Sequence, residues 1–267
     1  MESSPVLEVY EGSGSPVDDL AFEAWMLDRA AAGHPCACFT SWPGPVVVLG
    51  YAQDPADVDL EACRALAIPV LRRLTGGTGV IHRGDLGLSL ALPSSHAWAE
   101  GVVSLYGRFL DALGPALRAA GAAVERTHDA PHAARVRSPI CFEDQLSDTL
   151  LVDGRKAVGC AQTRRRGAVL IHAAVLLGLD AELYGRLFRV APERVRAALA
   201  PALAGADWRE LGRLAAASLA GRLGLAPRPL SAPEVPEQLR AVYRLPRWAP
   251  LAAAGPTAEA PGRSFSK

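Results

Sequence analysis

Hydrophobic and polar positions along the chain follow two periods, one typical of strands and one typical of helices. Short apolar runs bounded by proline or glycine predict strands over most of the first two thirds of the sequence. The expected strands are 7–10, 36–39, 46–49, 68–73, the end of 80–92 after a turn, 122–126, 148–152, 157–163 and 168–176. Asp153-Gly154 lies between two of these runs and is a strong signal for a hairpin turn.

Apolar residues at spacings of three and four predict the helices. In the longest of them, residues 98–121, Leu105, Phe109, Leu113 and Leu117 recur at this spacing. The other expected helices are 18–32, 57–67, 180–188, 192–203, 208–223 and a short one near 236–242.

The order of these elements indicates the fold class. Strands and helices do not alternate strictly, so we expect an α+β fold with mixed or antiparallel sheets packed against helices and a helical C-terminal end. The length of 267 residues is enough for one sizeable core. We expect one catalytic domain over residues 1–250. Residues 251–267 contain almost no large apolar side chain and are expected to form a disordered tail.

Composition excludes several classes of protein. Lys plus Arg is 28 and Asp plus Glu is 28, so the formal net charge is zero, which argues against nucleic acid or membrane phosphates as partners. The N-terminus lacks the basic and apolar segments of a secretory signal. Five cysteines, an odd number, favour a reduced, cytoplasmic protein over a disulfide scaffold.

The first candidate for chemistry is a glycine-rich loop after the predicted strand 68–73. Gly76, Gly77, Thr78 and Gly79 follow the Arg72-Arg73 pair. Glycines let backbone N–H groups approach a ligand, and the arginines supply fixed charge for a phosphate or carboxylate. The spacing fits neither the Walker pattern nor the dinucleotide fingerprint. The alternative is a hairpin with arginines that face solvent.

Lys156 is the second candidate. The chain has two lysines, Lys156 and Lys267, so arginine is the default cation in this sequence. A lysine just after a hairpin turn is usually an exposed charge. The scarcity of lysine favours the other interpretation, in which a compact ammonium on a flexible stem contacts a single carbonyl or phosphate oxygen.

Cysteine and histidine supply the remaining candidates. Cys141 lies near arginines that would lower the pKa of its thiol and make it a better nucleophile, although a half-buried structural cysteine is the simpler interpretation. Cys160 is a rival nucleophile. Cys36 and Cys38 share one face of a predicted strand, but no second pair completes a metal site, and we expect no metal. His82 and His172 follow β-branched residues on predicted strands and suit interior histidines as well as site residues.

These segments, in this order, resemble the lipoate-protein ligase and octanoyltransferase family, whose catalytic domain is shared with biotin ligases. The matching pieces are Val-Val-Leu-Gly-Tyr-Ala-Gln at 47–53, Arg-Arg-Leu-Thr-Gly-Gly at 72–77 with His82, Gly-Arg-Lys-Ala-Val-Gly-Cys-Ala-Gln at 154–162, and His172. Cys141, which is followed by Phe142, lies fifteen residues before the motif lysine, as in the cysteine-dependent octanoyltransferases. The resemblance implies a biotin/lipoate ligase-like catalytic domain.

The resemblance also implies a reaction. Octanoyl-acyl carrier protein would acylate Cys141, and the octanoyl (or lipoyl) group would pass to a lysine of a lipoyl domain, on the glycine-cleavage H protein or a 2-oxoacid dehydrogenase E2, as a step of lipoate biosynthesis and protein lipoylation. Lys156 would act with Cys141 in catalysis. The substrate-binding residues that the resemblance implies are Arg72, Arg73, Gly76, Gly77, Thr78, Gly79, His82, Gly159 and His172.

Several points stay open from the sequence. No cofactor is expected for the transferase, whereas ATP and magnesium would serve the alternative, an ATP-dependent lipoate ligase. A second alternative is a non-catalytic member of the family that binds an acyl or acyl-adenylate ligand. Strand alternation predicts that Val48, Leu49, Val70, Leu90 and Leu92 line the acyl slot. The base for the acceptor amine could be the released thiolate, His82 or the substrate itself.

Overall fold

The structure is a computed structural model, and it describes residues 5–127, 148–165 and 167–242. The strands in chain order are β1 (Val6–Glu11), β2 (Cys36–Thr40), β3 (Val46–Leu49), β4 (Val70–Arg72), β5 (Val80–His82), β6 (Leu86–Pro93), β7 (Glu125–Thr127), β8 (Thr149–Val152), β9 (Arg155–Lys156), β10 (Val158–Arg165), β11 (Ala168–Val175) and β12 (Ala226–Leu230). The helices are α1 (Pro16–Ala31), α2 (Leu60–Ala65), α3 (Val102–Ala119), α4 (Ala181–Phe188), α5 (Pro192–Ala198), α6 (Trp208–Leu223) and α7 (Glu237–Val242), with 3-10 turns η1 (Pro55–Asp57) and η2 (Ala97–Ala99).

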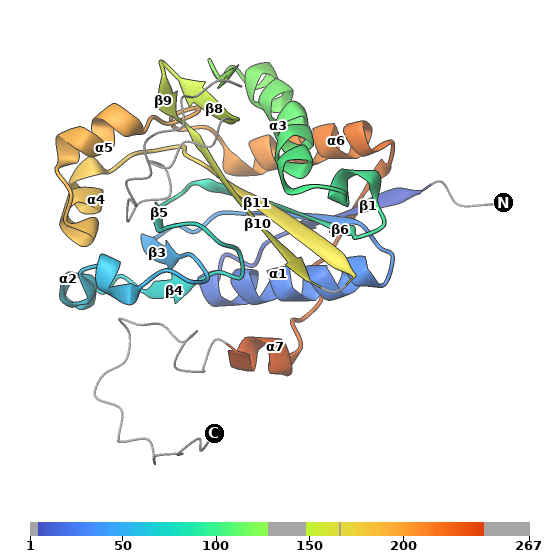
Figure 1. The fold of residues 1–267 in the computed structure, drawn as a ribbon, viewed down its shortest axis with the longest axis horizontal. Coiled ribbons are helices and arrows are strands. Elements are labelled where there is room, and N and C mark those ends of the chain that lie inside the picture. Colours follow the sequence, from blue (N-terminus) through green and yellow to red (C-terminus); the bar gives the residue numbers. More distant parts are fainter. Residues whose placement is uncertain (1–4, 128–147, 166, 243–267) are drawn as a thin grey trace, which may run out of the picture.

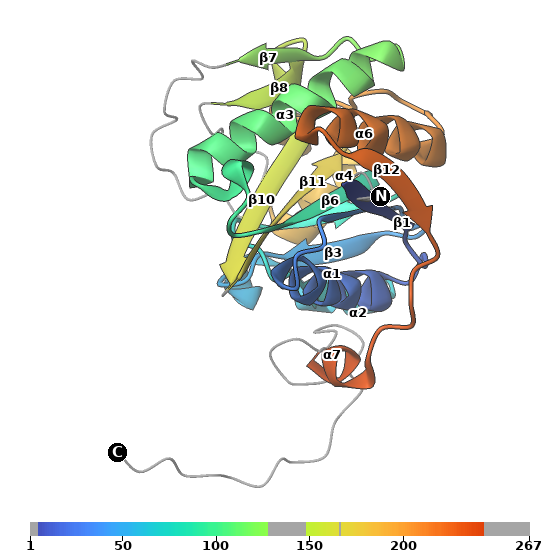
Figure 2. The same ribbon diagram turned by 90° about the vertical axis from the view of Figure 1, so that its right-hand side faces the viewer.

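A six-stranded mixed sheet forms the centre of the molecule, in the order β10-β11-β6-β2-β1-β12. Two three-stranded sheets, β4-β3-β5 and β7-β8-β9, accompany it. Helix α1 and the β4-β3-β5 sheet cover one face of the large sheet, and α3 and α6 cover the other face (Figures 1 and 2). The expected α+β class with mixed sheets is therefore confirmed.

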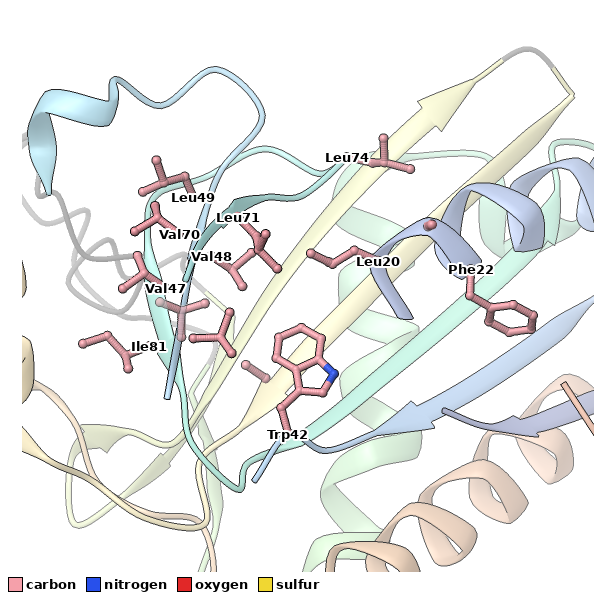
Figure 3. Close-up of a cluster of buried hydrophobic side chains, with 14 of the residues drawn as sticks. Leu20, Phe22, Trp42, Val47, Val48, Leu49, Val70, Leu71, Leu74 and Ile81 are labelled. Atoms are coloured by element: carbon pink, nitrogen blue, oxygen red, sulfur yellow. The ribbon is translucent and has the colours of Figure 1, made fainter. Parts of the chain in front are cut away.

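The two faces of the sheet bury two separate apolar clusters. On the α1 side, Leu20 and Phe22 of α1 pack with Trp42 and with the β4-β3-β5 sheet (Figure 3). On the other side, Leu88, Leu90 and Leu92 of β6 pack with side chains of α3 and α6. Because β6 is buried on both faces, its sequence is a nearly continuous apolar run with one polar residue, Ser89, turned toward the α1 side.

Most predicted elements are present, with differences at their ends. The Asp153-Gly154 turn joins β8 to β9, and both residues have positive φ, as a tight type I′ hairpin turn requires. The expected helix 98–121 is instead the η2 turn followed by α3, since Gly101 adopts an extended conformation and starts the helix anew. The expected helix 192–203 ends at Ala198, because Leu199 forms a β-bridge with Lys156.

Strand β12 was not predicted. Strand β12 has the sequence Ala-Pro-Arg-Pro-Leu and forms the edge of the large sheet, parallel to β1. An edge strand needs N–H groups on one side only, and alternate prolines at 227 and 229 leave the N–H groups of the other residues for β1. Because of these prolines, the hydrophobic pattern did not indicate a strand here.

The predicted division of the chain is not tested by the structure. The single domain over 1–250 stays a prediction, and the tail 251–267 lies outside the described residues. None of the helices in residues 5–127, 148–165 and 167–242 has the length and apolar character needed to cross a bilayer. Cys36, Cys38 and Cys63 are buried in the apolar core, as expected for core residues.

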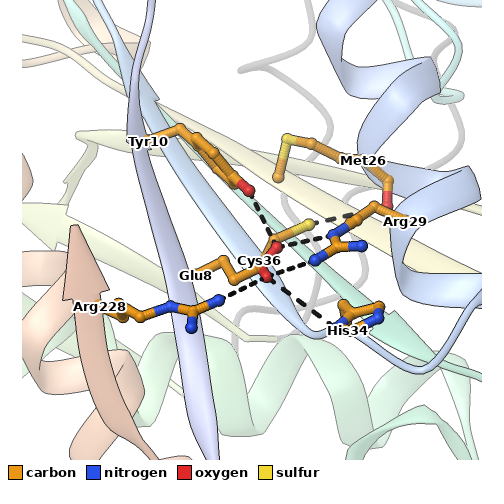
Figure 4. A network of polar contacts seen from close by, with 7 residues as sticks. All are labelled: Glu8, Tyr10, Met26, Arg29, His34, Cys36 and Arg228. Atoms are coloured by element: carbon orange, nitrogen blue, oxygen red, sulfur yellow. Dashed lines mark hydrogen bonds and ion pairs between the residues drawn. The ribbon is translucent and has the colours of Figure 1, made fainter. Parts of the chain in front are cut away.

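A buried carboxylate fastens β12 and α1 to β1. Glu8 of β1 is 1% exposed and accepts hydrogen bonds from Arg29 at 2.6 and 2.9 Å, from Arg228 of β12 at 3.0 Å and from the Tyr10 hydroxyl at 2.9 Å (Figure 4). The hydrogen bonds from Arg29, together with that from Tyr10, outweigh burial and lower the pKa of Glu8 to about 2. The ionised carboxylate therefore stabilises the folded protein.

A close backbone contact fixes the loop after β3. A β-carbon on Gly50 would lie 1.8 Å from the Gly77 carbonyl oxygen, so no side chain fits at residue 50. Gly77 itself has φ of +83°, a conformation that favours glycine. The glycine-rich loop after β4 thus rests directly on the chain that leaves β3.

We expect Glu8→Gln to lower the free energy of unfolding by about 3 kcal/mol, because it leaves two arginines facing a neutral amide. The wild-type contribution should be complete above the ordinary glutamate pKa of 4.5 and decline as the pH falls toward 2, since the folded-state pKa is the lower one. Urea unfolding at several pH values measures both effects. Exposed Glu193→Gln is the control and should change stability by less than about 0.5 kcal/mol. Equal effects of the two variants would contradict the buried-clamp interpretation.

We expect Gly50→Ala to destabilise the protein by about 2–3 kcal/mol, because the new methyl group must displace the Gly77 carbonyl. Gly44→Ala is the matched control, since a β-carbon there meets nothing within 4 Å and φ is not positive. Thermal and urea unfolding of both variants measure the difference. A Gly50→Ala protein as stable as Gly44→Ala would show that the loop moves aside freely.

Candidate functional site

The two arginines before the glycine-rich loop are buried and bonded to backbone carbonyls. Arg72 donates to the carbonyls of Gly50 at 2.7 Å, Tyr51 at 3.1 Å and Gln53 at 2.8 Å. These three bonds hold the chain that follows β3. The alternative of solvent-facing arginines is therefore wrong, because Arg72 and Arg73 are only 5% and 2% exposed.

Arg73 shapes the loop itself. Its guanidinium donates to the Thr75 hydroxyl at 2.9 Å and to the carbonyls of Gly76 at 2.6 Å and Thr78 at 2.9 Å. It also contacts the Val48 carbonyl of β3 at 3.3 Å. With the carbonyls of the loop turned toward Arg73, the loop has a defined shape before any ligand arrives.

A cavity lies between α1, the large sheet and the β4-β3-β5 sheet. Its lining combines apolar side chains with a few polar ones, the usual composition of a small-molecule site. The lining residues are Asp19, Leu20, Phe22, Glu23, Met26, Cys38, Thr40, Ser41, Trp42, Val48, Arg73, Val80, His82, Asp85, Gly87, Leu88, Ser89, Gly159, Cys160, Ala161, His172, Ala173 and Ala174.

The cavity brings together four of the predicted site residues. Arg73, His82, Gly159 and His172 contribute to its lining. The lining does not include Arg72, Gly76, Gly77, Thr78, Gly79 or Lys156. Cys141, the predicted nucleophile, lies outside the described residues.

A chain of hydrogen bonds crosses one side of the cavity. The Nε2 atom of His172 lies 2.9 Å from the Thr75 hydroxyl, and its Nδ1 atom lies 2.9 Å from Oε1 of Glu23. Ser89 donates to the same Glu23 oxygen at 2.7 Å. Burial alone would raise the pKa of Glu23, but the His172 ring, the Ser89 hydroxyl and Arg73 bring it below its ordinary value. Both hydrogen bonds of the ionised Glu23 carboxylate are on Oε1, and its buried Oε2 atom has no hydrogen-bond partner among the described residues.

The cavity contains a second acidic group with a different environment. Asp85, just before β6, is 4% exposed, and its Oδ1 atom accepts a hydrogen bond from the Leu177 N–H at 3.3 Å. Burial raises the pKa of Asp85 to about 7. His82 of β5 lies beside it, with Nδ1 3.9 Å from Oδ2. Glu23 and Asp85, two of the three carboxyl groups in the cavity lining, thus have pKa values shifted in opposite directions because their neighbours differ.

Lys156 is buried rather than exposed. It lies in β9, is 4% exposed, and its carbonyl accepts a hydrogen bond from the Ala200 N–H at 3.1 Å. The exposed-charge alternative is therefore wrong. An ammonium group is rarely buried without a role, since its desolvation is unfavourable.

Register separates Cys160 from His172. Cys160 pairs with Ala173 and Ala161 pairs with His172 across β10 and β11, and directly paired residues share a face of the sheet. Cys160 packs with the α3 and α6 cluster, whereas His172 points to α1. The register thus turns the Cys160 side chain away from the face that bears His172.

Of the five residues predicted to line an acyl slot, only Val48 lines this cavity. Leu49 and Val70 are packed inside the α1-side cluster, and Leu90 and Leu92 lie on the opposite face of the large sheet. Alternation along β6 was assigned to the wrong face, because both faces of this strand are apolar.

Several cavity residues were missed by the sequence reasoning. Glu23 is the clearest, because it lies three residues after Leu20 and four before Leu27, on the apolar stripe of α1, where an acid needs a partner. Ser89 interrupts an apolar strand in the same way. Asp85 follows a turn, where a polar residue is ordinary, so the sequence did not mark it as a cavity residue. The described residues contain no group of three or more His, Cys, Asp or Glu side chains placed to hold a metal ion.

Comparisons with known proteins agree with this architecture. Residues 15–206 match the lipoyl protein ligase A/B catalytic domain. The octanoyltransferase LipM of Geobacillus kaustophilus is 34% identical over 192 residues, which are 68% of this chain and 68% of that protein. The octanoyltransferase LipM of Anoxybacillus flavithermus is 32% identical over 194 residues, 69% of this chain and 70% of that protein.

Solved structures share the fold at lower identity. A lipoate-protein ligase A bound with ATP superposes with a TM-score of 0.71 at 21% identity, covering 90% of this chain and 94% of the other. A bi-partite lipoate protein ligase from Thermoplasma acidophilum, described with its E2 lipoyl domain, gives a TM-score of 0.72 at 21% identity, covering 97% and 100%. On the match over residues 15–206 and the similarity to these octanoyltransferases, the chain belongs to the lipoyl protein ligase A/B catalytic domain family.

Proposed function

We propose that this chain is an octanoyltransferase that moves an octanoyl group from acyl carrier protein to a lysine of a lipoyl domain, through a thioester on Cys141. The observation that carries the proposal is the one-third identity to two octanoyltransferases named LipM over about 70% of the chain. The buried lysine at residue 156, fifteen positions after Cys141, supports it.

The first step exchanges one thioester for another. The Cys141 thiolate attacks the carbonyl carbon of the octanoyl thioester, a new C–S bond forms, and the carrier thiolate leaves. The acyl bond keeps its reactivity, so this step needs no ATP. A reduced, cytoplasmic setting suits the free thiol that the step requires.

The second step forms the product. The acceptor lysine amine attacks the carbonyl of octanoyl-Cys141, the C–S bond breaks, and an amide remains after the amine loses a proton. Lys156 and backbone N–H groups of residues 76–79 stabilise the negative charge that develops on the carbonyl oxygen in both steps. Of the predicted binding residues, Arg73 shapes that loop, and Arg72 fixes the chain beside it.

The cavity suits an eight-carbon chain. Its apolar lining includes Phe22, Met26, Trp42 and Val80, and Gly159 of β10 also contributes. Burying methylenes contributes about 0.8 kcal/mol each, which favours a long acyl group over acetyl. His82 and His172 add polar contacts at the cavity wall.

The acceptor is a lipoyl domain, on the glycine-cleavage H protein or a 2-oxoacid dehydrogenase E2. A solved structure with this fold is described together with its E2 lipoyl domain, which supports this class of partner. The ATP-dependent ligase remains the alternative, since a ligase bound with ATP has the same fold. We propose no metal, nucleic acid or membrane partner.

Incubation with octanoyl-acyl carrier protein should add one octanoyl group to the wild-type protein, measured by intact mass and removed by hydroxylamine. Cys141→Ser should form no such thioester and should lose transfer by about a thousandfold or more, because the nucleophile is absent. Cys160→Ser tests the rival nucleophile. Loss of the octanoyl adduct in this variant but not in Cys141→Ser would identify Cys160 as the nucleophile.

Other outcomes of the same experiment contradict the proposal. Transfer of free lipoate with ATP that survives Cys141→Ser indicates the ligase. Binding of octanoate or lipoate without transfer to any lipoyl domain indicates the non-catalytic alternative.

We expect Lys156→Arg to lower the rate of thioester formation by about a hundredfold or more, because a planar guanidinium cannot reproduce a point charge on one oxygen. Single-turnover acylation followed by intact mass measures the rate. Circular dichroism and the unfolding midpoint establish that the variant is folded. If Lys156→Arg formed the thioester at the wild-type rate, Lys156 would have no catalytic role in this step.

A further inference from the structure

One row of small residues crosses the large sheet inside the cavity. Gly159 of β10, Ala174 of β11 and Gly87 of β6 are paired side by side on three adjacent strands (Figure 1). All three residues line the cavity. The neighbouring row, two positions along each strand, contains His172 and Ser89, which face α1, so the row of small residues faces α1 as well. Because no side chain in this row is larger than a methyl group, the row forms the floor of a trough that runs across the strands.

Thr40 of β2 closes one end of this trough. Thr40 pairs with Gly87 and leans over it, since a β-carbon on Gly87 would lie 2.4 Å from Oγ1 of Thr40. On its other side, a β-carbon on Gly12 would lie 2.5 Å from Cγ2 of Thr40. The buried Asp19 carboxyl group lies 3.0 Å from the same point and accepts a hydrogen bond from Trp42 at 2.8 Å. Thr40 is therefore held between two glycines, and an apolar chain that passed it would approach a buried carboxyl group.

The other boundaries place the open end of the trough at β10. The hydrogen-bonded residues His172 and Glu23 line one long side. Leu20 of α1 and Val48 of β3 line the cavity opposite the large sheet. Strand β2 is followed in the sheet by β1 and β12, whereas β10 is an edge strand in the part of the chain that the structure describes. A chain can thus enter at β10, and Lys156 lies two residues before this strand.

The length of the trough matches an acyl chain of defined size. Neighbouring strands are about 4.8 Å apart, so the path from β10 over β11 to β6 is about 10 Å long. An extended saturated chain advances about 1.3 Å for each carbon–carbon bond, so an octanoyl group extends about 9 Å from its carbonyl carbon to its methyl group. Two further carbons would add about 2.5 Å and would reach the side chain of Thr40.

We propose that the acyl chain lies across β10, β11 and β6 in this trough, and that Thr40 limits its length to about eight carbons. This inference rests on the proposed function for the nature of the substrate. Thr40 is a specificity-determining residue, because its two γ-atoms occupy the space that a longer chain would need. Ala174 lies at the middle of the floor and sets the room for the middle of the chain.

Competition among acyl donors tests the proposal. The wild-type protein is mixed with equal amounts of butanoyl-, hexanoyl-, octanoyl- and decanoyl-acyl carrier protein, and the adducts formed in a single turnover are quantified by intact mass. Each methylene buried in the trough should favour the longer chain by about fourfold. This increase should stop at octanoyl, and the decanoyl adduct should be less abundant than the octanoyl adduct.

Thr40→Ala removes both γ-atoms, so the ratio of decanoyl to octanoyl adduct should rise by about fifteenfold, the gain from burying two further methylenes. Thr40→Val is the matched control, because it keeps the shape of the side chain and should keep the wild-type ratio. Ala174→Val adds two methyl groups to the floor, so its ratio of octanoyl to butanoyl adduct should fall by about tenfold or more. This variant covers the case in which Thr40→Ala fails to fold, and unfolding midpoints establish which variants are folded.

Wild-type ratios in folded Thr40→Ala or in folded Ala174→Val overturn the inference and leave the proposed function intact. Absence of every adduct in the wild-type protein contradicts the proposed function instead. Calorimetric titration with free hexanoate, octanoate and decanoate then tests the inference by itself. The affinity of the wild-type protein should rise up to octanoate and fall for decanoate, whereas that of Thr40→Ala should rise through decanoate. The same order of affinities in both proteins, or no binding of octanoate, overturns the inference.

Discussion

Arg73 joins the three parts of the molecule that enclose the cavity. Its guanidinium binds the Val48 carbonyl of β3 and the carbonyls of Gly76 and Thr78 in the glycine-rich loop. Through the Thr75 hydroxyl it is connected to His172 of β11, and His172 is connected to Glu23 of α1. A buried guanidinium group is tolerated only when its N–H donors have hydrogen-bond partners. The positions of the loop, the sheet and the helix therefore depend on one another.

Two of the three carboxyl groups in the cavity lining, those of Glu23 and Asp85, have different properties. Glu23 has His172 and Ser89 as partners and stays ionised, so it orients a histidine. Asp85 has the backbone N–H groups of Leu177 and Arg83 as partners, but its burial outweighs them and raises its pKa to about 7. Two carboxyl groups whose surroundings push their pKa values apart can perform different tasks at one pH.

The sequence was sufficient for elements whose local signals agree with their tertiary setting. The Asp153-Gly154 turn, the amphipathic α3 and the strand β3 are such cases. Prediction from the sequence failed for elements whose conformation or orientation depends on tertiary contacts. The prolines of β12 are tolerated only because it is an edge strand, and Leu90 and Leu92 could be assigned to either face of a strand buried on both sides. The buried state of Arg72 and Arg73 was equally hidden, since their partners are backbone carbonyls that no residue type reveals.

The burial of Lys156 constrains how protons can move in the site. An ammonium group that stabilises a developing oxyanion has three donors and no lone pair, so it cannot accept a proton while it performs that task. Amide formation nevertheless releases one proton from the acceptor amine. In the proposed mechanism, a second group therefore receives this proton. The end of the sheet that carries Lys156 also carries Asp85, one position before β6 and with an unpartnered oxygen among the described residues. The fold thus places a buried lysine, in β9, and a buried aspartate, directly before β6, at one end of the large sheet.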